Sequence, residues 1–342
     1  MKPYHPAPIF TAWLSASHHP IQPKFVTEVA GFSKRLTKAV SPTGRLWSAM
    51  VRVMAILATI TLFEAPFLNA QLGMFSDEQR IRLTKAWEGE RFEDGRPKVP
   101  DSVIDRLRQT TAEEAWSVVS AAGFRDQFEG GWRQFNDHED RIVGRAVTAV
   151  FMPIRPDVNA VINETAEAEG RVAKGQNSWV IDELQPGDVL VVDLYGKYNF
   201  MGDNLAVSIF SKSKTGVVID GGARDLSGIR EIDGFTGYVR QFHPSSVTHG
   251  IRNTMLMGIN VPVRIGDTTV MPGDIVLGDP EGVMFIPAQL AGKVADKSEI
   301  TRLRDEWGHQ MLREGKYTPG QIDTSWSPEM ESAFESWMEQ RK

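Results

Sequence analysis

The sequence contains no cysteine in its 342 residues. Disulfides and thiolate chemistry are therefore excluded, and any bound metal must take oxygen or histidine ligands. Oxygen ligands favour magnesium or manganese, so any divalent metal cofactor is expected to be of this kind. The absence of cysteine leaves the redox compartment of the protein open.

An excess of positive charge is also lacking. The chain has 38 Lys and Arg against 44 Asp and Glu, a formal net charge of −6, and no basic stripe. Because phosphate binding is dominated by Lys and Arg, we expect no nucleic-acid partner and favour a small molecule or a protein. Hydrophobic residues make up 41%, enough for a core. The length fits two average domains or one α/β domain with extensions.

Long hydrophobic runs are missing as well. The uncharged run from Val53 to Phe63 is too short to span a bilayer, so no stable membrane span is expected. Its length is typical of a signal-peptide apolar region; Arg52 precedes it and Ala70 is a small residue at a plausible cleavage point. We interpret residues 1–70 as a signal peptide, which predicts a periplasmic or secreted protein.

The residues around this run leave two other interpretations open. The first 49 residues carry scattered Pro, Ser, Lys and His without periodicity, as in a disordered leader or a mis-assigned start whose true position is Met50 or Met54. Glu64 and Pro66 also fit a buried helix of a cytoplasmic protein.

Beyond the leader, helical and β-branched patterns alternate, which predicts a layered α/β domain. We expect a helical extension with Ser76 as N-cap and a linker over 71–98, a catalytic domain over 99–306, and an aromatic-rich tail over 307–342 that packs onto the domain or a neighbouring subunit. The expected strands are 144–150, 189–194, 216–220, 261–265 and 275–277, and the expected helices are 101–108, 110–122, 157–174, 205–213 and 287–308.

One charged pattern stands out within this domain. Asp203 precedes Arg224-Asp225 by twenty intervening residues, with glycine turns at both places. Asp203 falls at an expected helix start, where backbone N–H groups favour anions, and Arg224-Asp225 follow an expected strand, a usual position for α/β active sites. Two carboxylates and one guanidinium are therefore expected to face one cleft. An isolated Arg-Asp pair can equally be a structural ion pair, and Asp203 a simple N-cap.

This spacing resembles the family of the regulator of ribonuclease activity A and the class II 4-hydroxy-4-methyl-2-oxoglutarate aldolases, whose hallmark is an Asp, twenty residues, then Arg-Asp. The resemblance runs from about Val99 to about Arg304, with further matches in family order at 142–148, 186–193, 260–263, 272–279 and 281–287. It implies a layered α/β/α domain of the swivelling β/β/α type, and a homotrimer or dimer of trimers with sites between subunits.

The resemblance also implies a metal-dependent lyase. Such an enzyme cleaves a 4-hydroxy-2-oxo acid to pyruvate, as an aldolase, or acts as an oxaloacetate decarboxylase. Asp225 is then the metal ligand, Arg224 binds substrate and stabilises the enolate, and Asp203 orients water or transfers a proton. Gly202, Asn204 and Leu205 would offer backbone N–H groups to the substrate carboxylate. The alternative is a non-catalytic, protein-binding regulator, because the family's namesake regulates ribonuclease E by contact.

Three further features bear on the site. The aldolases of the family add an acid from the adjacent subunit, for which Glu299 lies at about the right distance, with Asp296, Asp305 and Glu306 as competitors. His243 and His249 flank a loop that is expected to line the pocket. The bulky segment 195–200, where many relatives have small residues, is expected to narrow or reshape the pocket.

Overall fold

The computed structural model describes residues 76–136, 141–171 and 175–341. The described residues belong to one compact unit. The expected leader and its apolar run lie outside the described residues. Within the described ranges no helix has the length and apolar character needed to cross a membrane.

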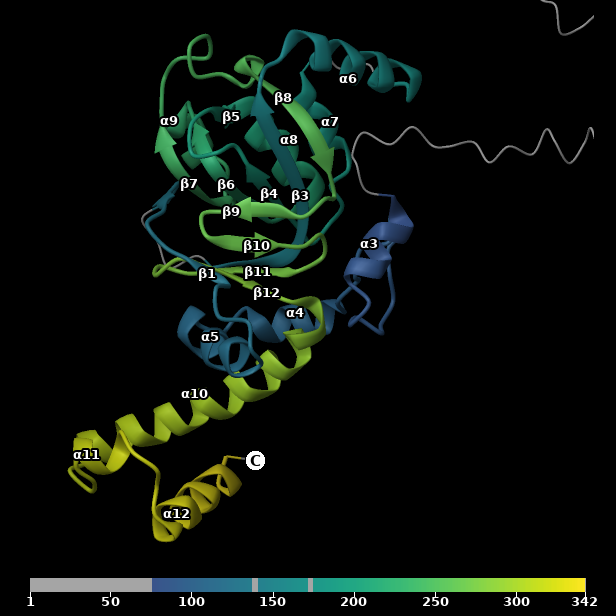
Figure 1. Ribbon diagram of the computed structural model, residues 1–342. Helices are drawn as coiled ribbons and strands as arrows, with labels where there is room; N and C mark the ends of the chain where they lie inside the picture. Colours follow the sequence, from purple (N-terminus) through teal and green to yellow (C-terminus); the bar gives the residue numbers. More distant parts are fainter. Residues whose placement is uncertain (1–75, 137–140, 172–174, 342) are drawn as a thin grey trace, which may run out of the picture. The chain divides into compact units, whose positions relative to one another are not determined.

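The elements follow one another in mixed order (Figure 1). The helices are α3 (Asp77–Leu83), α4 (Asp101–Leu107), α5 (Ala112–Ala121), α6 (Pro156–Ala168), α7 (Gln176–Asp182), α8 (Asp203–Ser213), α9 (Leu226–Arg230), α10 (Ala291–Arg313), α11 (Pro319–Ile322) and α12 (Pro328–Glu339), with 3-10 turns η3 (Ile251–Asn253) and η4 (Ala288–Leu290). The strands are β1 (Phe128–Glu129), β2 (Arg133–Gln134), β3 (Ile142–Pro153), β4 (Asp188–Asp193), β5 (Asn199–Met201), β6 (Gly216–Ala223), β7 (Thr236–Phe242), β8 (Thr254–Ile259), β9 (Val263–Ile265), β10 (Thr268–Val270), β11 (Ile275–Gly278) and β12 (Val283–Ile286).

Ten of these strands form one mixed sheet in the order β1-β12-β11-β3-β4-β6-β7-β2, with β5 on β6 and β8 on β3. The strands β3, β4, β6 and β7 are parallel, whereas β8, β11 and β12 pair antiparallel. Parallel strands bring their carboxyl ends to one edge of a sheet. The end of β6 therefore lies where α/β proteins usually hold ligands.

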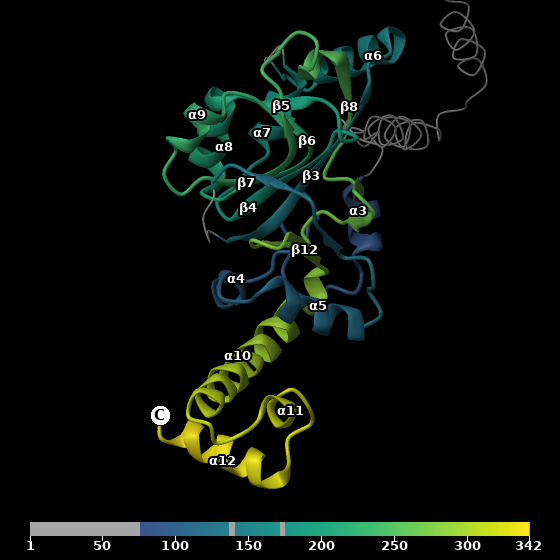
Figure 2. The ribbon, with the colours of Figure 1, turned by 90° about the vertical axis from the view of Figure 1, so that its left-hand side faces the viewer.

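The long strand β3 shows how the sheet is covered. Ile142, Ala146 and Val150 face an apolar core that the β9–β10 hairpin also contributes to. On the opposite face, Val143 packs in a core with α4, α5 and α10, while Val147 and residues beyond it pack in a core with α7 and α8. Side chains that alternate along one strand thus reach three separate cores. Helices α4, α5 and α10 cover one part of the sheet, and α7 and α8 cover another (Figure 2). This arrangement confirms the predicted layered α/β fold.

The segment before the core is not a loose linker. Arg96 is fully buried and its guanidinium binds the buried Asp188 at 3.1 Å and Asp94 at 2.7 Å. Arg80 donates to the backbone oxygen of Asn260 at 2.8 Å. An isolated buried charge is costly, so these pairs fix residues 77–98 against the sheet. The sequence predicted a linker because the segment is polar. Its ion-pair partner, Asp188, lies far along the chain, so the local sequence gives no sign of the pairing.

The aromatic tail folds on the far half of α10. Trp307, Met311, Met330 and Phe334 form a small core, and the tilted ring of Trp326 packs on Trp307 with the centroids 4.7 Å apart. These aromatics therefore pack as predicted, but with one another and with α10 in a cluster separate from the sheet's cores, and not onto the sheet domain.

Several predicted boundaries shift. The helix expected over 157–174 ends at Ala168 in the described structure, since Gly170 takes a positive φ of 75°. The strand expected from 261 begins at Val263, after Asn260 at φ 52°. The strands β8 and β12 and the helix α7 were missed. Ser76 is confirmed as the N-cap of α3, and Thr111 caps α5.

Candidate active site

The residues Arg224 and Asp225 come directly after β6, and Asp203 begins α8, so the fold places all three at one end of the sheet. The backbone N–H of Arg224 donates to the oxygen of Met201 at 3.1 Å, which ties the end of β6 to the chain leading into α8. The Arg224 guanidinium pairs with the Asp225 carboxylate. Arg224 and Asp225 therefore form one ion-paired cluster, and Asp203 lies at the start of the neighbouring helix α8.

Gly202 has no side chain and so leaves room for Arg224 and Asp225, an arrangement that we call the cradle at Gly202. A Cβ at Gly202 would lie 2.5 Å from Oδ2 of Asp225 and 3.0 Å from Cζ of Arg224. The absence of a side chain thus lets both charged groups lie against the backbone at the start of α8. Asp225 adopts the left-handed conformation, at φ 59°, which Asp and Asn tolerate better than most residues.

Asp203 occupies the first turn of α8 but is not its N-cap, which is Gly202. Its Oδ1 accepts the N–H of Asn204 at 2.8 Å. A Cβ at Gly228 would lie 2.8 Å from Oδ2 of Asp203, so this carboxylate packs against the short helix α9. The simple-cap interpretation is wrong in this detail, and the catalytic role of Asp203 stays a prediction.

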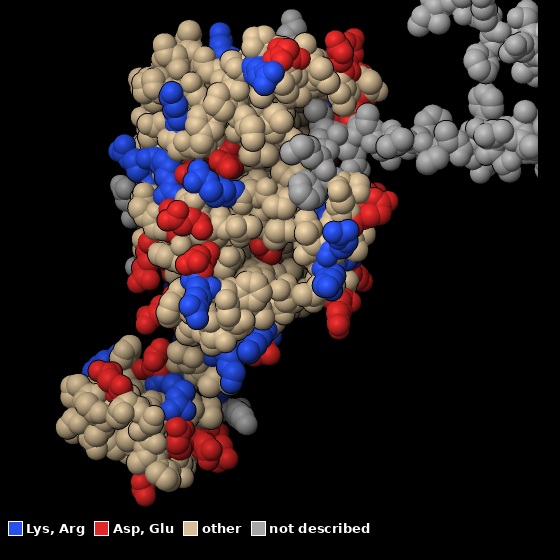
Figure 3. Space-filling model, in the orientation of Figure 1, with Lys and Arg blue, Asp and Glu red and all other residues tan. Residues whose placement is uncertain are grey.

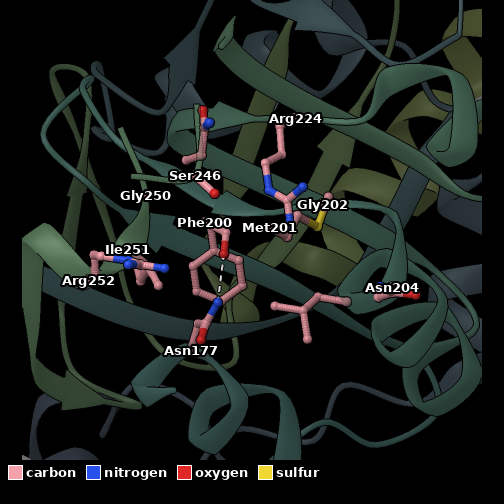
Figure 4. A pocket seen from close by; sticks show the side chains of 12 residues that line it. Asn177, Phe200, Met201, Gly202, Asn204, Arg224, Ser246, Gly250, Ile251 and Arg252 are labelled. Carbon is pink, nitrogen blue, oxygen red and sulfur yellow. Dashed lines mark hydrogen bonds between the residues drawn. The ribbon is translucent and has the colours of Figure 1, made fainter. Parts of the chain in front are cut away.

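A cavity of about 200 Å³ opens beside the cluster (Figure 4). It is smaller than the roughly 300 Å³ at which sites for drug-sized ligands begin. The lining comes from α7, β5, the start of α8, Arg224 and the loop before β8, and consists of Asn177, Asn199, Phe200, Met201, Gly202, Asn204, Leu205, Arg224, Ser246, Gly250, Ile251 and Arg252. Gly202, Asn204, Leu205 and Arg224 were predicted substrate contacts, and all four line it. Of the described lining residues, two are basic and none is acidic.

The loop from His243 to Asn253 lines the cavity as expected, but through other residues. The rings of His243 and His249 stack on each other, 3.6 Å apart between centroids. The cavity is lined instead by Ser246, Gly250, Ile251 and Arg252. The histidines thus support the loop, and their proposed substrate contact is not seen in the cavity lining.

The bulky segment 195–200 contributes to the pocket through its end. Asn199 and Phe200 line the cavity, whereas the Tyr195 and Tyr198 rings pack edge to face, with centroids 5.7 Å apart. Gly221 and Gly222 make room for this segment, since a Cβ at either would come within 2.8 Å of Tyr198 or Asn199 atoms. Burial raises the pKa of the Tyr195 hydroxyl to about 12.

The acid expected from a neighbouring subunit is engaged within this chain. Glu299 of α10 accepts from Arg106 of α4 at 2.7 and 2.9 Å, and Asp296 accepts from the same guanidinium at 2.6 Å. The hydrogen bond from Arg106 lowers the pKa of Glu299. In one chain Glu299 therefore serves α4–α10 packing, and its role in a neighbour's site stays a prediction.

The donor set at the cluster fits a weakly held hard cation. Within the described ranges, no group of three or more His, Asp or Glu is placed to hold a metal. Magnesium keeps several waters and commonly takes one or two carboxylates plus substrate oxygens. Asp225 is 39% exposed and offers such a carboxylate beside Gly202. Neither Asp225 nor Asp203 lines the cavity itself, so of the three charged residues expected to face one cleft only Arg224 does.

Sequence reasoning missed Asn177, Ser246 and Arg252. Each reaches the cavity from an element whose local pattern carries no signal for chemistry. On the face shown in Figure 3, acidic and basic side chains are interspersed.

A Thermus thermophilus protein named 4-hydroxy-4-methyl-2-oxoglutarate aldolase is 29% identical over 115 residues, 33% of this chain and 67% of that protein. The Legionella pneumophila protein DlpA is 26% identical over 209 residues, 60% of this chain and 31% of DlpA. The crystal structure of Streptomyces coelicolor RraAS2, described as an unusual member of the RNase ES inhibitor RraA family, matches with TM-score 0.52 and 26% identity, over 63% of this chain and 98% of that one. Residues 102–285, more than half of the chain, match the family model RraA-like, Aldolase/RraA, and the chain therefore belongs to this family.

Proposed function

We propose that the protein is a divalent-metal-dependent carbon–carbon lyase acting on a 2-oxo acid. The reaction is retro-aldol cleavage of a 4-hydroxy-2-oxo acid to pyruvate, decarboxylation of oxaloacetate, or both. The observation that carries the proposal is the cradle at Gly202, which holds Arg224 and Asp225 against the start of α8 beside a basic cavity. Relatives named as aldolases support it.

The start of α8 would bind the substrate carboxylate. Asn204 and Leu205 lie in the first turn of an eleven-residue helix, where backbone N–H groups have no carbonyl partner within the helix. Both residues line the cavity. The N–H of Asn204 bonds to Oδ1 of Asp203, so a substrate carboxylate would replace that bond or bind at Leu205. An anion placed there is stabilised by these N–H groups and by the helix dipole.

Arg224 would stabilise the charge that develops on the keto oxygen. Both reactions break a bond beyond the α-carbon and leave the electrons in an enolate. A planar, always-charged guanidinium places N–H donors where that negative charge collects. Because Asp225 already holds Arg224 in one orientation, little reorganisation is needed when the bond breaks.

Asp225 would hold the cation, and Asp203 would orient water or carry a proton. When bound, magnesium or manganese polarises the carbonyl as a Lewis acid. The Asp203 carboxylate contacts α9 at Gly228, one helical turn after Asp225. This position suits a group that supports the reaction without lining the cavity. A trimer or dimer of trimers, with an acid such as Glu299 supplied by a neighbour, belongs to the same proposal.

The second candidate is a non-catalytic, protein-binding regulator. The likeness to RraAS2 favours it, because that protein is described as a member of a ribonuclease-inhibitor family. The two candidates make opposite predictions for the purified chain.

The deciding assay supplies a panel of 2-oxo acids with magnesium, with manganese and with a chelator, and measures pyruvate. Metal-dependent release of pyruvate supports the lyase. Its absence from folded protein, together with a changed messenger half-life on overexpression, supports the regulator.

A further inference from the structure

Arg252 is a second cationic group at the cavity that the proposed reaction does not use. It belongs to η3, on the loop between β7 and β8, and lines the cavity together with Arg224. Arg224 comes from the end of β6, so the two guanidinium groups approach from different sides (Figure 4). The Arg252 side chain is exposed, and among the described residues it has no acidic partner.

The backbone that carries Arg252 is held firmly. Asn199 donates its N–H to the oxygen of His249 at 2.7 Å and its side-chain amide to the oxygen of His243 at 2.6 Å. Asn253 donates to the oxygens of Val247 and Gly250, both at 2.9 Å. The loop is thus tied to β5 and to itself on both sides of Arg252.

Gly250 shows how closely this loop is folded. A Cβ there would lie 2.0 Å from the backbone oxygen of Ser246, so only glycine permits the turn that directs η3 toward the cavity. A fixed backbone beneath an unpaired charge reduces the conformational entropy lost when that charge binds a ligand.

The cavity therefore has two anion-binding positions. One is the start of α8 with Arg224, already assigned to the 2-oxo carboxylate and its enolate. The other is Arg252. Arg224 already has Asp225 as a counter-charge. Arg252 has none, because no acidic residue lines the cavity among the described residues, so a substrate with a single negative charge, bound at the start of α8, would leave Arg252 unpaired.

We infer that Arg252 is the specificity-determining residue of this site and binds a second carboxylate at the substrate end remote from the keto group. The inference rests on the proposed function for the identity of the substrate as a 2-oxo acid. A guanidinium matches a carboxylate with two parallel hydrogen bonds, whereas a methyl group in the same place leaves it unpaired.

The test is a binding measurement with two unreactive compounds of equal chain length, 2-oxoglutarate and 2-oxopentanoate. At the end remote from the keto group, 2-oxoglutarate has a carboxylate and 2-oxopentanoate has a methyl group. Calorimetry with magnesium is carried out on the full chain, on Arg252→Gln, and on Arg313→Gln. Arg313 is an exposed arginine at the end of α10, so its substitution gives the same charge change elsewhere.

The wild type and Arg313→Gln are expected to bind 2-oxoglutarate at least about tenfold tighter than 2-oxopentanoate, and Arg252→Gln to bind the two alike, with an unchanged melting temperature. Three results would overturn the inference: no preference in the wild type, a preference that persists in Arg252→Gln, or equal weakening of both compounds. Preferential binding without any pyruvate release in the lyase assay would instead reject the proposed function while leaving the Arg252 assignment standing.

Discussion

Gly202 sets how closely two charged side chains approach the first turn of α8. Its φ of −119° is open to any residue, so its importance comes from space and not from backbone freedom. A methyl group there would overlap the Asp225 carboxylate, 2.5 Å away, and crowd the Arg224 guanidinium.

We therefore predict that Gly202→Ala reduces lyase activity by about tenfold or more, since a displacement of about 1 Å can cost roughly a hundredfold. Stability should change little because the clash falls on side chains at the pocket edge. Gly292→Ala is the matched control, because a Cβ at Gly292 meets no atom within 4 Å. Steady-state rates and melting temperatures of both variants provide the check, and equal activities would contradict the cradle's importance.

Arg224 is predicted to act through the shape of its donor fork. Arg224→Lys keeps the charge but replaces a planar group with an ammonium, which cannot bind both the enolate oxygen and Asp225 in the same manner. We expect kcat to fall by about 10²–10³, the usual loss for one donor to a developing oxyanion. A variant with the wild-type kcat would reject this role.

At the scale of elements, two Pro-Gly-Asp turns, at 186–188 and 272–274, lead into β4 and β11, the strands on either side of β3. Gly187 and Gly273 have φ values of 84° and 86°. The Asp188 carboxylate accepts the N–H of Gln185 at 2.9 Å, and that of Asp274 accepts the N–H of Met271 at 2.8 Å. The turns are alike, yet Asp188 has Arg96 as a counter-charge, whereas no cation binds Asp274 among the described residues.

This difference predicts a pH effect on stability. Burial raises the pKa of Asp274 to about 7, from an ordinary value of 3.8. The folded protein thus retains a proton that the unfolded chain releases above about pH 4. The stability that neutral Asp274 contributes is complete below pH 4 and is lost as pH rises to about 7.

Asp274→Asn stays neutral throughout. Its free energy of unfolding should therefore rise relative to that of the wild type between pH 4 and 7, by at most about 1.4 kcal/mol per pH unit. Urea unfolding at several pH values measures the difference. A constant difference across this range would show that Asp274 is ionised in the folded protein.

The elements around the site were largely predictable. A β-branched run between glycines identified β6, and the apolar spacing after Asp203 identified α8. The strand β8 was missed because Met255, Leu256 and Met257 carry little β propensity, and their strand depends on pairing with β3. Arg252 and Asn177 could not be assigned to the site from sequence, since only the folded chain brings α7 and η3 to the end of β6.

At the scale of the whole molecule, the resemblance covers the sheet and its helices but not the ends of the chain. Residues 77–98 are fixed to the sheet by the Arg96–Asp188 pair. The α10–α12 cluster has a core of its own. Function is therefore expected to depend on the α/β domain and to tolerate changes in the outer face of α12.

The leader gives a prediction about location. We propose that residues 1–70 are removed on export, because the run from Val53 to Phe63 is followed by a small residue, Ala70, at a plausible cleavage point. The mature protein should begin near Gln71 and keep its activity without the preceding residues. Amino-terminal sequencing of protein from a native host tests this, and an intact leader on cytosolic protein would falsify export.

The central claim is that Arg224, with a cation on Asp225, stabilises a pyruvate enolate, whatever the natural substrate. An enolate that forms reversibly exchanges the methyl protons of pyruvate with solvent. We therefore expect the methyl NMR signal of pyruvate in heavy water to decay with the protein and magnesium, and not with chelator or with Asp225→Asn, in which Asn suits the left-handed backbone and the fold is kept. A decay no faster than that with magnesium alone, from folded wild-type protein, would contradict the account.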